Sequence, residues 1–441
     1  MRLEFKEGKS NKFWQAELGK TWVDVSWGRV GTEGQKKRHE FGGPRDAAAN
    51  FEKLIAQKKA KGYREVGAEK SAPVARDAKL EAAIRERPDD QAARLVYSDF
   101  LQSAGDPLGE LIAVQVALSK KKDAAQTKRQ NALLKSLALL DSDLGTLNFK
   151  WGLLESVRIE NVRDWMDDSF DVRPVLEKLF SSTACVALRE FKVGVIRWDG
   201  HMEDLQRLFE IAGRFEWSKG LERLHLGDVE DVDMTHHSIG KVGKAISATF
   251  PGLRSLILHG GQHYAEHDAS LDFSGLDLPE LKHLVIETCS MNKKRLKALW
   301  AAKLPKLEGL TLWFGDREDY GATATLKDLA PLLEGKVFPK LKHLGLANAA
   351  FESELAAALP KSKLAPQLES LDLSMGTLHD DDVPGLVAAA KTFTKLQSLD
   401  VSDNFLTKAG VAALSKAYPN LDGGDQRTPY EPGERYVSVS E

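Results

Sequence analysis

Three histidines have the spacing that most readily suggests metal chemistry. His225, His259 and His283 each fall in a separate short apolar segment that we expect to be a strand. Neighbouring strands lie about 4.8 Å apart, so imidazoles at matching positions could share a Zn²⁺ ion. These three occupy the fifth, seventh and third positions of their segments, which places them on a diagonal, and the chain has no HExxH or paired CxxC pattern. We therefore expect no metal, no cofactor and no catalytic residue, and interpret the histidines as polar residues of a binding surface.

Aromatic and cationic side chains near the N-terminus suggest binding to nucleic acid. Trp27 and Arg29 are two residues apart, and Lys36, Lys37 and Arg38 follow shortly after. An indole can stack on a base or sugar, and a guanidinium can donate two parallel hydrogen bonds to a phosphate. The three later cations could add non-specific attraction to the phosphate backbone.

A structural interpretation of the same residues stays open. Val23, Val25 and Trp27 alternate with a period of two, so they share one face of a strand. That pattern predicts a core position for Trp27 and a solvated face for the nearby lysines. The pattern as a whole favours nucleic-acid binding without excluding this alternative.

The elements that would position these residues form a small α+β unit over residues 1–66. The segments SNKFWQAEL, TWVDVSWGRV and QKKRHEF read as strands, and GTEG reads as a turn between the last two. A helix is expected to begin at Asp46 and to end at Gly62. Trp27 and Arg29 would then lie at the end of a hairpin strand.

This unit resembles the WGR domain, which occurs in DNA-dependent poly(ADP-ribose) polymerases and in many bacterial proteins. The resemblance rests on Asn11-Lys12-Phe13-Trp14, Trp27-Gly28-Arg29-Val30-Gly31-Thr32, Gly34-Gln35 and Lys61-Gly62-Tyr63. It implies that Asn11, Trp27 and Arg29 contact nucleic acid, as the matching residues do at DNA ends. The domain can also serve contacts between domains. No ADP-ribosyltransferase segment follows, so that activity is not implied.

The strongest pattern in the chain is a repeated L-x-x-L-x-L segment. Good copies begin at Leu221, Leu253, Leu281, Leu307, Leu341, Leu368 and Leu396, and weaker ones at Leu154 and Leu188. Their spacing of 26 to 34 residues is typical of leucine-rich repeats, in which a short strand is followed by a helix. The polar slot after the strand holds Cys289 in one copy and Asn404 in the last. We interpret both side chains as structural, which disfavours a reactive thiol.

Alternation along each strand predicts which side chains would face a partner. The fourth and sixth positions of the repeat enter the core, and the third, fifth and seventh point out from a concave sheet. We expect this face to bind a protein. Its candidate residues are Arg223, His225, Ile257, His259, His283, Trp313, His343, Asp372 and Asp400.

Trp313 carries two interpretations. A tryptophan on an open sheet face would be an anchor for a partner, because aromatic residues dominate interface energetics. Alternatively, it folds under the loop that follows it and packs on Tyr320.

Residues 67–77 have the composition of a linker, and residues 78–150 are expected to be a helical cap for the first repeat. The cap resembles a repeat-companion domain of bacterial multidomain proteins in the stretches Leu95-Val96-Tyr97-Ser98-Asp99-Phe100-Leu101, Gly105-Asp106-Pro107 and Gly109-Glu110-Leu111-Ile112. Repeats would then fill residues 151–421, and residues 422–441 would form a capping tail.

From about Leu221 onward the chain is also similar to an uncharacterised family of bacterial leucine-rich-repeat proteins. The similarity rests on Leu312-Trp313-Phe314-Gly315, Asp319-Tyr320-Gly321, Leu371-Asp372-Leu373-Ser374-Met375-Gly376-Thr377-Leu378 and Arg435-Tyr436-Val437-Ser438-Val439-Ser440-Glu441. It implies that the tail is an integral part of the fold. We expect residues 436–439 to pair with the last repeat and to cover its open edge.

Composition and charge agree with a modular soluble protein. The chain of 441 residues is 42% hydrophobic and 29% charged, and no apolar run is long enough to span a membrane. The charged N-terminus lacks an apolar signal core, and two cysteines cannot form a disulfide framework, so we expect a cytoplasmic protein. Residues 1–75 carry 16 Lys and Arg against 10 Asp and Glu, whereas the rest carries 46 against 55. A basic head on an acidic body fits a polyanion-binding N-terminus.

The sequence thus predicts an α/β chain: a leucine-rich-repeat solenoid with ribonuclease-inhibitor-like strand–helix repeats, preceded by a small α+β WGR domain and a helical cap. The expected function is that of a non-enzymatic adaptor, whose N-terminal unit binds DNA or RNA and whose concave face binds a protein. The alternative is a scaffold that binds only proteins, with the N-terminal unit docking on a partner or on the solenoid. Neither membrane nor cofactor binding is expected.

Overall fold

The computed structural model describes residues 2–7, 10–32, 34–65, 76–160, 172–195, 203–229, 235, 237–261, 270–429, 431 and 433–440. The chain divides into two compact units. Among the described residues, the small unit lies within residues 2–76 and the large unit within residues 77–440. No described helix combines the length and the apolar character that a membrane span needs.

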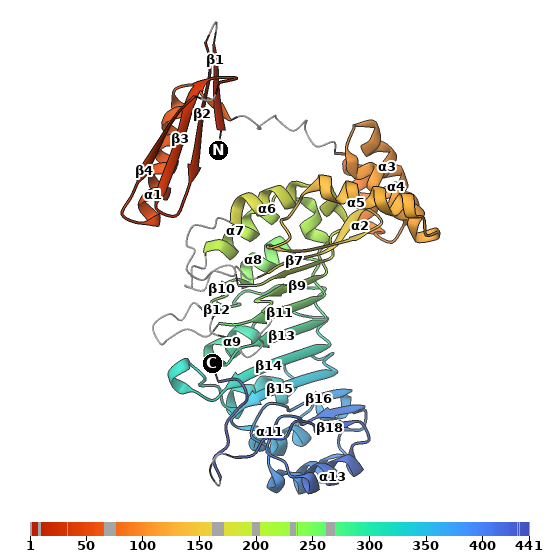
Figure 1. Ribbon diagram of the computed structural model, residues 1–441. Coiled ribbons are helices and arrows are strands. Elements are labelled where there is room, and N and C mark those ends of the chain that lie inside the picture. Colours follow the sequence, from red (N-terminus) through yellow and green to blue (C-terminus); the bar gives the residue numbers. More distant parts are fainter. Residues whose placement is uncertain are drawn as a thin grey trace. The chain divides into compact units, whose positions relative to one another are not determined.

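The small unit is an antiparallel sheet with a helix on one face (Figure 1). Its strands follow the order β4-β3-β2-β1-β5. Their bounds are β1 (Arg2–Glu7), β2 (Ser10–Leu18), β3 (Trp22–Arg29), β4 (Gln35–Glu40) and β5 (Arg64–Glu65), and the helix is α1 (Pro44–Ala60). Period-two alternation places Trp14, Ala16, Val23 and Val25 on the face that packs against Ile55 of α1.

The opposite face of this sheet has its own buried aromatic ring. Phe13 is only 4% exposed although it points away from α1. It packs on the hairpin, where Gly28 and Gly34 leave room for it: a Cβ on Gly34 would lie 2.7 Å from the Phe13 ring and 2.6 Å from the carbonyl oxygen of Trp27. Gly34 also has a φ of +68°, which disfavours other residues. The two glycines therefore let the hairpin fold back over Phe13.

The large unit begins with four helices that each start at an aspartate. They are α2 (Ala78–Glu86), α3 (Gln91–Ser103), α4 (Pro107–Lys120) and α5 (Ala124–Leu137), and their N-cap carboxylates accept backbone N–H hydrogen bonds. The caps are Asp77, Asp90, Asp106 and Asp123. The expectation of a helical segment to residue 150 is wrong at its end, because Gly145–Lys150 forms strand β6. That strand pairs antiparallel with β7 and is the first strand of the main sheet.

The main sheet has eleven strands in the order β18-β17-β16-β15-β14-β13-β11-β9-β8-β7-β6. From β7 onward all pairs are parallel, and each strand is the neighbour of the preceding one. The strands are β7 (Leu153–Ile159), β8 (Glu190–Val193), β9 (Arg223–Leu226), β11 (Ser255–His259), β13 (His283–Glu287), β14 (Gly309–Gly315), β15 (His343–Ala349), β16 (Ser370–Asp372), β17 (Ser398–Asp400) and β18 (Leu421–Asp422). β10 (Gly240–Lys241) and β12 (Leu271–Asp272) form a separate parallel pair.

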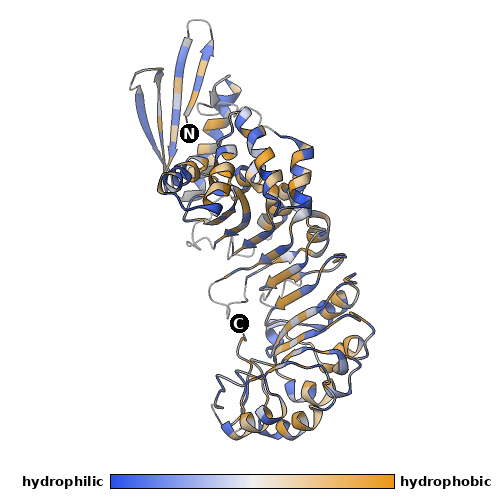
Figure 2. Cartoon of the chain, turned by 90° about the vertical axis from the view of Figure 1, so that its right-hand side faces the viewer, coloured by the Kyte–Doolittle hydropathy of each residue, from blue (hydrophilic) through white to orange (hydrophobic). Residues whose placement is uncertain are grey.

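Short helices connect most of these strands. They are α6 (Val172–Ser181), α7 (Glu203–Ala212), α8 (Gly243–Thr249), α9 (Lys293–Trp300), α10 (Ala330–Leu333), α11 (Glu352–Ala358), α12 (Val383–Ala389) and α13 (Lys408–Ala417). Figure 2 shows the strands of the sheet mostly in the apolar colour and the helices with both colours, as expected for helices with one face on the sheet.

The nine predicted repeats correspond to the consecutive parallel strands β7 to β17. Equivalent positions pair directly: Leu256 lies opposite Leu224 on one side and Leu284 on the other. These fourth-position leucines are at most 2% exposed. The expected inward orientation of the fourth and sixth positions is confirmed.

The polar slot after the strand works as expected in the last repeat. Asn404 is completely buried, and its Oδ1 accepts a hydrogen bond from the Leu378 amide at 2.9 Å. Its Nδ2 donates to the carbonyl oxygens of Leu373, Val401 and Ser402. Cys289 is also completely buried, but its Sγ accepts instead from the Thr235 hydroxyl at 2.9 Å. Burial raises the pKa of the Cys289 thiol to about 11, which opposes a nucleophilic role.

Candidate binding surfaces

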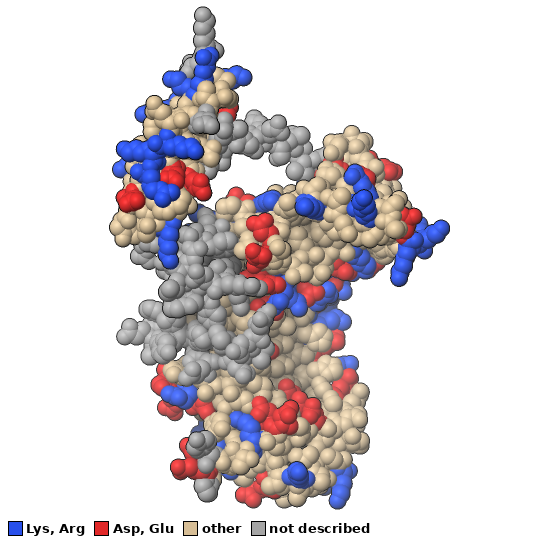
Figure 3. Space-filling view, in the orientation of Figure 1, with Lys and Arg blue, Asp and Glu red and all other residues tan. Residues whose placement is uncertain are grey.

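The small unit carries a basic surface on its edge hairpin. Arg29, Lys36 and Lys37 are exposed, and none of them forms an ion pair within the part of the chain that the structure describes. Figure 3 shows Lys and Arg side chains gathered over this unit. Exposed cations without carboxylate partners remain available to phosphates.

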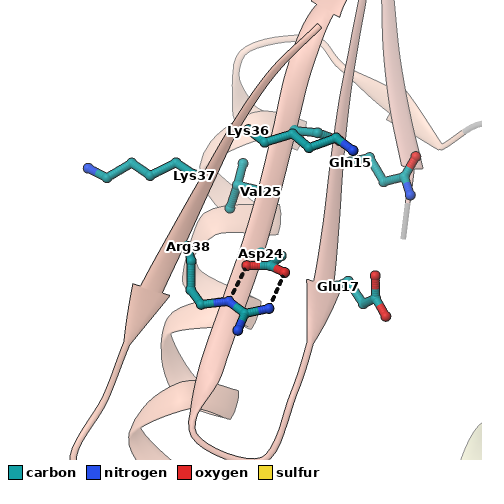
Figure 4. Close-up of a pocket in the computed structure, with 8 residues that line it drawn as sticks. Gln15, Glu17, Asp24, Val25, Lys36, Lys37 and Arg38 are labelled. Carbon is teal, nitrogen blue, oxygen red and sulfur yellow. Dashed lines mark hydrogen bonds and ion pairs between the residues drawn. The ribbon is translucent and has the colours of Figure 1, made fainter. Parts of the chain in front are cut away.

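Arg38 differs from its neighbours because its charge is already paired. Its Nε and Nη2 donate to the two carboxylate oxygens of Asp24 at 2.8 and 2.7 Å (Figure 4). Its guanidinium carbon also lies 4.0 Å from the centre of the Trp22 ring. The ion pair lowers the pKa of Asp24, chiefly through the Arg38 hydrogen bond. Arg38 therefore contributes less to a phosphate-binding surface than the prediction assumed.

A shallow pocket of about 320 Å³ lies on the same face of the sheet (Figure 4). Its lining combines both signs of charge: Gln15, Glu17, Asp24, Val25, Ser26, Lys36, Lys37 and Arg38. Because Glu17 and Asp24 are part of this lining, the pocket itself is a poor anion site. Lys36 and Lys37 lie at its β4 side.

Trp27 and Asn11 are only partly accessible. Trp27 pairs across the sheet with Trp14 and packs against the core of the small unit, as the structural alternative expected. Its half-buried ring keeps one part at the surface. Asn11 is also half-buried, and its Oδ1 is shielded without a hydrogen-bond partner among the described residues.

In the large unit, the third and fifth repeat positions form two accessible rows across the main sheet, which we call the outward rows. Arg223 and His283 of the third-position row are exposed, and His343 is half-buried. The fifth-position row contains half-buried His225, Ile257, Asp372 and Asp400. This row changes from Arg158 and Lys192 at the β7 end to Asp400 and Asp422 at the β18 end. Arg158 is already paired with Asp228, and Lys192 with Glu190, so the cations at the β7 end contribute less to a binding surface than their number suggests.

The expectation that the seventh position is open is wrong for His259 and Trp313. They are 1% and 8% exposed, respectively. His259 Nδ1 lies 2.9 Å from a Glu287 carboxylate oxygen, and its ring stacks on that of His237. Trp313 packs with Cys289, Ala347 and Val439 of the C-terminal tail. Trp313 is thus neither an exposed anchor for a partner nor packed on Tyr320. Chain segments remote in sequence cover the seventh repeat positions at this point.

His225, His259 and His283 each have a different polar or aromatic neighbour: Asp228, Glu287 and His343. No group of three His, Cys, Asp or Glu side chains among the described residues could hold a metal ion. His225 Nδ1 lies 3.4 Å from Asp228, whereas His283 lies near His343 with 6.4 Å between ring centres. Burial lowers the pKa values of His225 and His283, which favours neutral rings.

The comparisons with known proteins identify the small unit. Residues 1–70 match the family model of the WGR domain. The small unit is a WGR domain. No curated protein matches the chain. A protein of Bacteroides fragilis known from a crystal structure is similar over 100% of this chain and 99% of its own, with 20% identity and a TM-score of 0.54, which shows a similar fold.

Two other solved structures cover part of the chain. An internalin of Listeria monocytogenes is 18% identical over 58% of this chain and 71% of its own, with a TM-score of 0.28. A leucine-rich-repeat protein of Leptospira interrogans is 16% identical over 56% of this chain and 62% of its own, with a TM-score of 0.23.

The expected contact residues of the WGR domain are not equally placed. Arg29 lies at the end of β3, opposite Lys12 on β2, and both side chains are exposed. Lys36 and Lys37 follow on β4, the outer strand of the sheet, and their side chains point in opposite directions (Figure 4). Trp27 precedes them on the helix side, and the buried Oδ1 of Asn11 is turned away from solvent.

The C-terminal tail makes contacts that the sequence did not predict. The expected pairing of residues 436–439 with the last repeat is wrong. Ser438 instead donates its amide to the carbonyl of Met375, and Val439 binds the side chain of Asn348. The tail therefore lies across earlier repeats and also contacts the last one, where the Ser438 hydroxyl donates to Asp403 and the Tyr436 ring packs against Phe405. No strand pairs with the tail among the described residues, and β18 remains the outer strand of the sheet.

A buried carboxyl group lies beside this tail. Glu352 is completely buried; its Oε2 accepts from the Thr377 amide at 3.0 Å, and its Oε1 has no partner among the described residues. A Cβ on Gly376 would lie 1.9 Å from this carboxyl group, which explains the glycine. Burial raises the pKa of Glu352 well above its ordinary value of 4.5.

Replacing Glu352 with glutamine should therefore stabilise the large unit at neutral pH. The folded state favours the protonated acid. The contribution of the Glu352 carboxyl group to the free energy of unfolding is therefore fully present below pH 4.5 and is lost as the pH rises above that value. Glutamine cannot ionise. The free energy of unfolding of Glu352→Gln minus that of wild type should therefore increase between about pH 5 and about pH 8. Denaturant unfolding at each pH measures it. Glu354→Gln, on the exposed side of α11, is the control, and equal pH profiles for all three proteins would contradict the assignment.

Proposed function

We propose that this protein is a non-enzymatic modular adaptor. Its WGR domain binds nucleic acid at ends or along the phosphate backbone, and the outward rows form the concave face of a leucine-rich-repeat solenoid that binds a protein. The observation that carries the proposal is the combination of a WGR domain with Arg29, Lys36 and Lys37, which lie at the end of β3 and on its edge strand β4, are exposed and form no ion pair with the residues that the structure describes. Nucleic acid is a polyanion that such an edge can bind without reading sequence.

The outward rows support the second part of the proposal. Nine consecutive parallel strands present exposed or half-buried side chains at fixed spacing, which is how repeat proteins build extended binding surfaces. Asp372, Asp400 and Asp422 at the β18 end of the fifth-position row would favour a partner with basic side chains there. We also propose a cytoplasmic location, in keeping with the absence of a disulfide between Cys185 and Cys289.

A purely protein-binding scaffold is the second candidate, and two observations favour it. Trp27 packs against the core of the WGR domain, and Arg38 is held by Asp24. Both residues are therefore less available to nucleic acid than the sequence suggested. In this case the WGR domain would dock on a protein surface.

The salt dependence of nucleic-acid binding separates the two candidates. The full chain should bind a short DNA duplex or RNA hairpin with an affinity that falls steeply as salt increases. Arg29→Ala/Lys36→Ala/Lys37→Ala should weaken binding by at least about tenfold and reduce the salt slope by about three, one for each phosphate that is no longer neutralised. Fluorescence anisotropy at several salt concentrations measures both.

Lys391→Ala/Lys395→Ala/Lys408→Ala is the matched control, because it removes three exposed cations from the large unit. Its affinity and slope should equal those of wild type. Comparing a linear duplex with a closed circle tests for recognition of ends. If the wild-type chain shows no salt-sensitive binding to either nucleic acid, the scaffold becomes the better description.

A further inference from the structure

The last repeats share an unusual backbone feature three residues after the fifth position. Asn348, Met375, Asp403 and Asp425 have φ values of 54°, 67°, 53° and 49°. They are equivalent, because Gly345, Asp372, Asp400 and Asp422 pair in register across β15 to β18. Non-glycine residues rarely adopt this left-handed conformation, least of all a long side chain such as methionine. We call these four residues the left-handed column.

The column is held in place by hydrogen bonds between repeats. The amides of Asn348, Met375 and Asp403 donate to the carbonyl oxygens of Ser374, Ser402 and Gly424 in the next repeat, at 2.9 to 3.1 Å. The backbone donors are therefore used within the sheet. The side chain of Asn348, the carbonyl of Met375 and the Oδ2 atom of Asp403 remain for another segment, whereas Asp403 Oδ1 is paired with Arg427 at 2.9 Å.

Three members of the column bind the C-terminal tail. The Asn348 side chain donates to the Val439 carbonyl at 2.6 Å and accepts from the Val439 amide at 2.9 Å. The Met375 carbonyl accepts from the Ser438 amide at 2.9 Å, and the Asp403 carboxylate accepts from the Ser438 hydroxyl. Figure 1 shows the C-terminus beside β14 and β15. The column thus forms hydrogen bonds with the backbone of an extended peptide.

An apolar floor lies under the same peptide. Val439 packs against Trp313, Cys289 and Ala347, with Met375 at the margin. Val437 and Val439 are each 1% exposed, whereas the residues on either side of them are half-buried or exposed. Alternate side chains of the peptide are therefore buried, and Val439 enters the floor while the backbone binds the column. Extended peptides are recognised in this way at protein surfaces.

We propose that the left-handed column and its apolar floor form a peptide-binding groove, in which the tail is a resident ligand. The inference rests on the proposed capture of a protein by the large unit, and it names what is captured: an extended partner segment in which two β-branched residues flank a small polar one. Such a segment would replace residues 437–439. Conformational strain is stored at ligand clamps, and Met375 is an example of a strained residue at the contact.

Mass action favours a partner protein over a second copy of this chain. Because the tail and the groove belong to one chain, the effective concentration of the tail at the groove is about millimolar. The tail of a second copy makes the same contacts and so cannot displace it at ordinary concentrations. A partner that also contacts the outward rows gains additional affinity and can displace it.

The test uses the full chain and a labelled peptide with the sequence of residues 434–441. In the variant Val437→Asp/Val439→Asp the tail should leave the groove, because burying a charge at each of these two positions, both 1% exposed, is costly. This variant should bind the peptide at least about tenfold more tightly than wild type does. Val96→Asp/Val387→Asp adds the same charges at valines that are 54% and 38% exposed, and should bind like wild type.

Asn348→Gly in the released-tail variant tests the column itself. Glycine keeps the left-handed backbone and removes only the amide that binds Val439. Loss of its two hydrogen bonds should weaken peptide binding by about tenfold or more. A scrambled peptide should not bind.

A second variant covers the case in which the aspartate variant fails to fold. A protease site inserted between Gly433 and Glu434 allows the tail to be cut after folding, and the cut tail should then exchange with labelled peptide. Three results would overturn the groove. The peptide could bind wild type and the released-tail variant equally well, it could fail to bind a folded released-tail variant, or Asn348→Gly could leave its affinity unchanged. Concentration-dependent dimers of wild type that the peptide dissociates would overturn the choice of partner. These results do not depend on nucleic-acid binding or on capture of a partner by the outward rows, so the groove and the proposed function can fail separately.

Discussion

Replacing Trp14 with alanine is expected to unfold the WGR domain and to leave the large unit folded. Trp14 is 2% exposed and lies at the centre of the core, opposite Trp27 and next to Leu3. Truncating a buried tryptophan costs about 3–5 kcal/mol. A core of this size supplies a net stability of only about 3–5 kcal/mol. The folded domain should therefore be the minor species at 25 °C.

Calorimetry of the full chain measures this result. The wild-type chain should unfold in two transitions, one for each compact unit, and the variant should lose the smaller one. Gln15→Ala is the matched control, since Gln15 is the exposed neighbour of Trp14 on β2 and points to the other face. It should keep both transitions. If Trp14→Ala retains both, the core of the WGR domain has been assigned incorrectly.

The same variant connects stability to function. If the WGR domain is the part that binds nucleic acid, Trp14→Ala should abolish salt-sensitive binding without removing any of the three edge cations. The aspartates and cations of the outward rows are unaffected, so capture of a protein by the large unit should persist. Loss of both activities together would argue against separate roles for the two units.

The sequence predicted the repeated strands well because the signal is local. The leucines at the fourth and sixth positions alternate within a few residues, and each copy repeats the same pattern. The polar slot was also predictable, since Asn404 caps the turn that follows its own strand. Such features depend only on residues close in the chain.

The sequence failed where distant segments meet. Trp313 was expected on an open face, but Val439, more than a hundred residues later, covers it. His259 is shielded together with His237, which precedes its strand, and no periodicity reports that contact. The left-handed conformation of Met375 has no signal in its residue type. Asn348 and Glu352 were missed for the same reason: their partners Val439 and Thr377 lie 91 and 25 residues away.

The seventh-position row therefore has a different role from the outward rows. The row is apolar where the tail crosses it, at Trp313 and Ala347, and the tail shields this patch from solvent. An exposed apolar patch on a soluble protein is a binding site or an aggregation hazard. A resident tail resolves that conflict, because it keeps the patch covered until a better ligand arrives.

Replacing Gly315 with alanine is expected to disrupt the repeats that build this floor. Gly315 ends β14 with a φ of +82°, and an added Cβ would lie 1.9 Å from the carbonyl oxygen of Cys289. The nearest atoms belong to the backbone of the neighbouring repeat, so no side-chain rotation can relieve the contact. The left-handed conformation alone costs an alanine about 1–2 kcal/mol, and overpacking adds about 1–3 kcal/mol.

Gly105→Ala separates these two contributions. Gly105 has a similar φ of +76°, but nothing lies within 4 Å of its Cβ position, so only the conformational cost applies. The unfolding free energy of Gly315→Ala should therefore fall by about 1–3 kcal/mol more than that of Gly105→Ala, as measured by denaturant titration of the large unit. Since the contact joins β14 to the repeat of Cys289, its disruption should also loosen the floor under Val439 and increase peptide exchange. Equal losses for the two alanine variants would mean that the neighbouring repeats are not packed as closely as the fold requires.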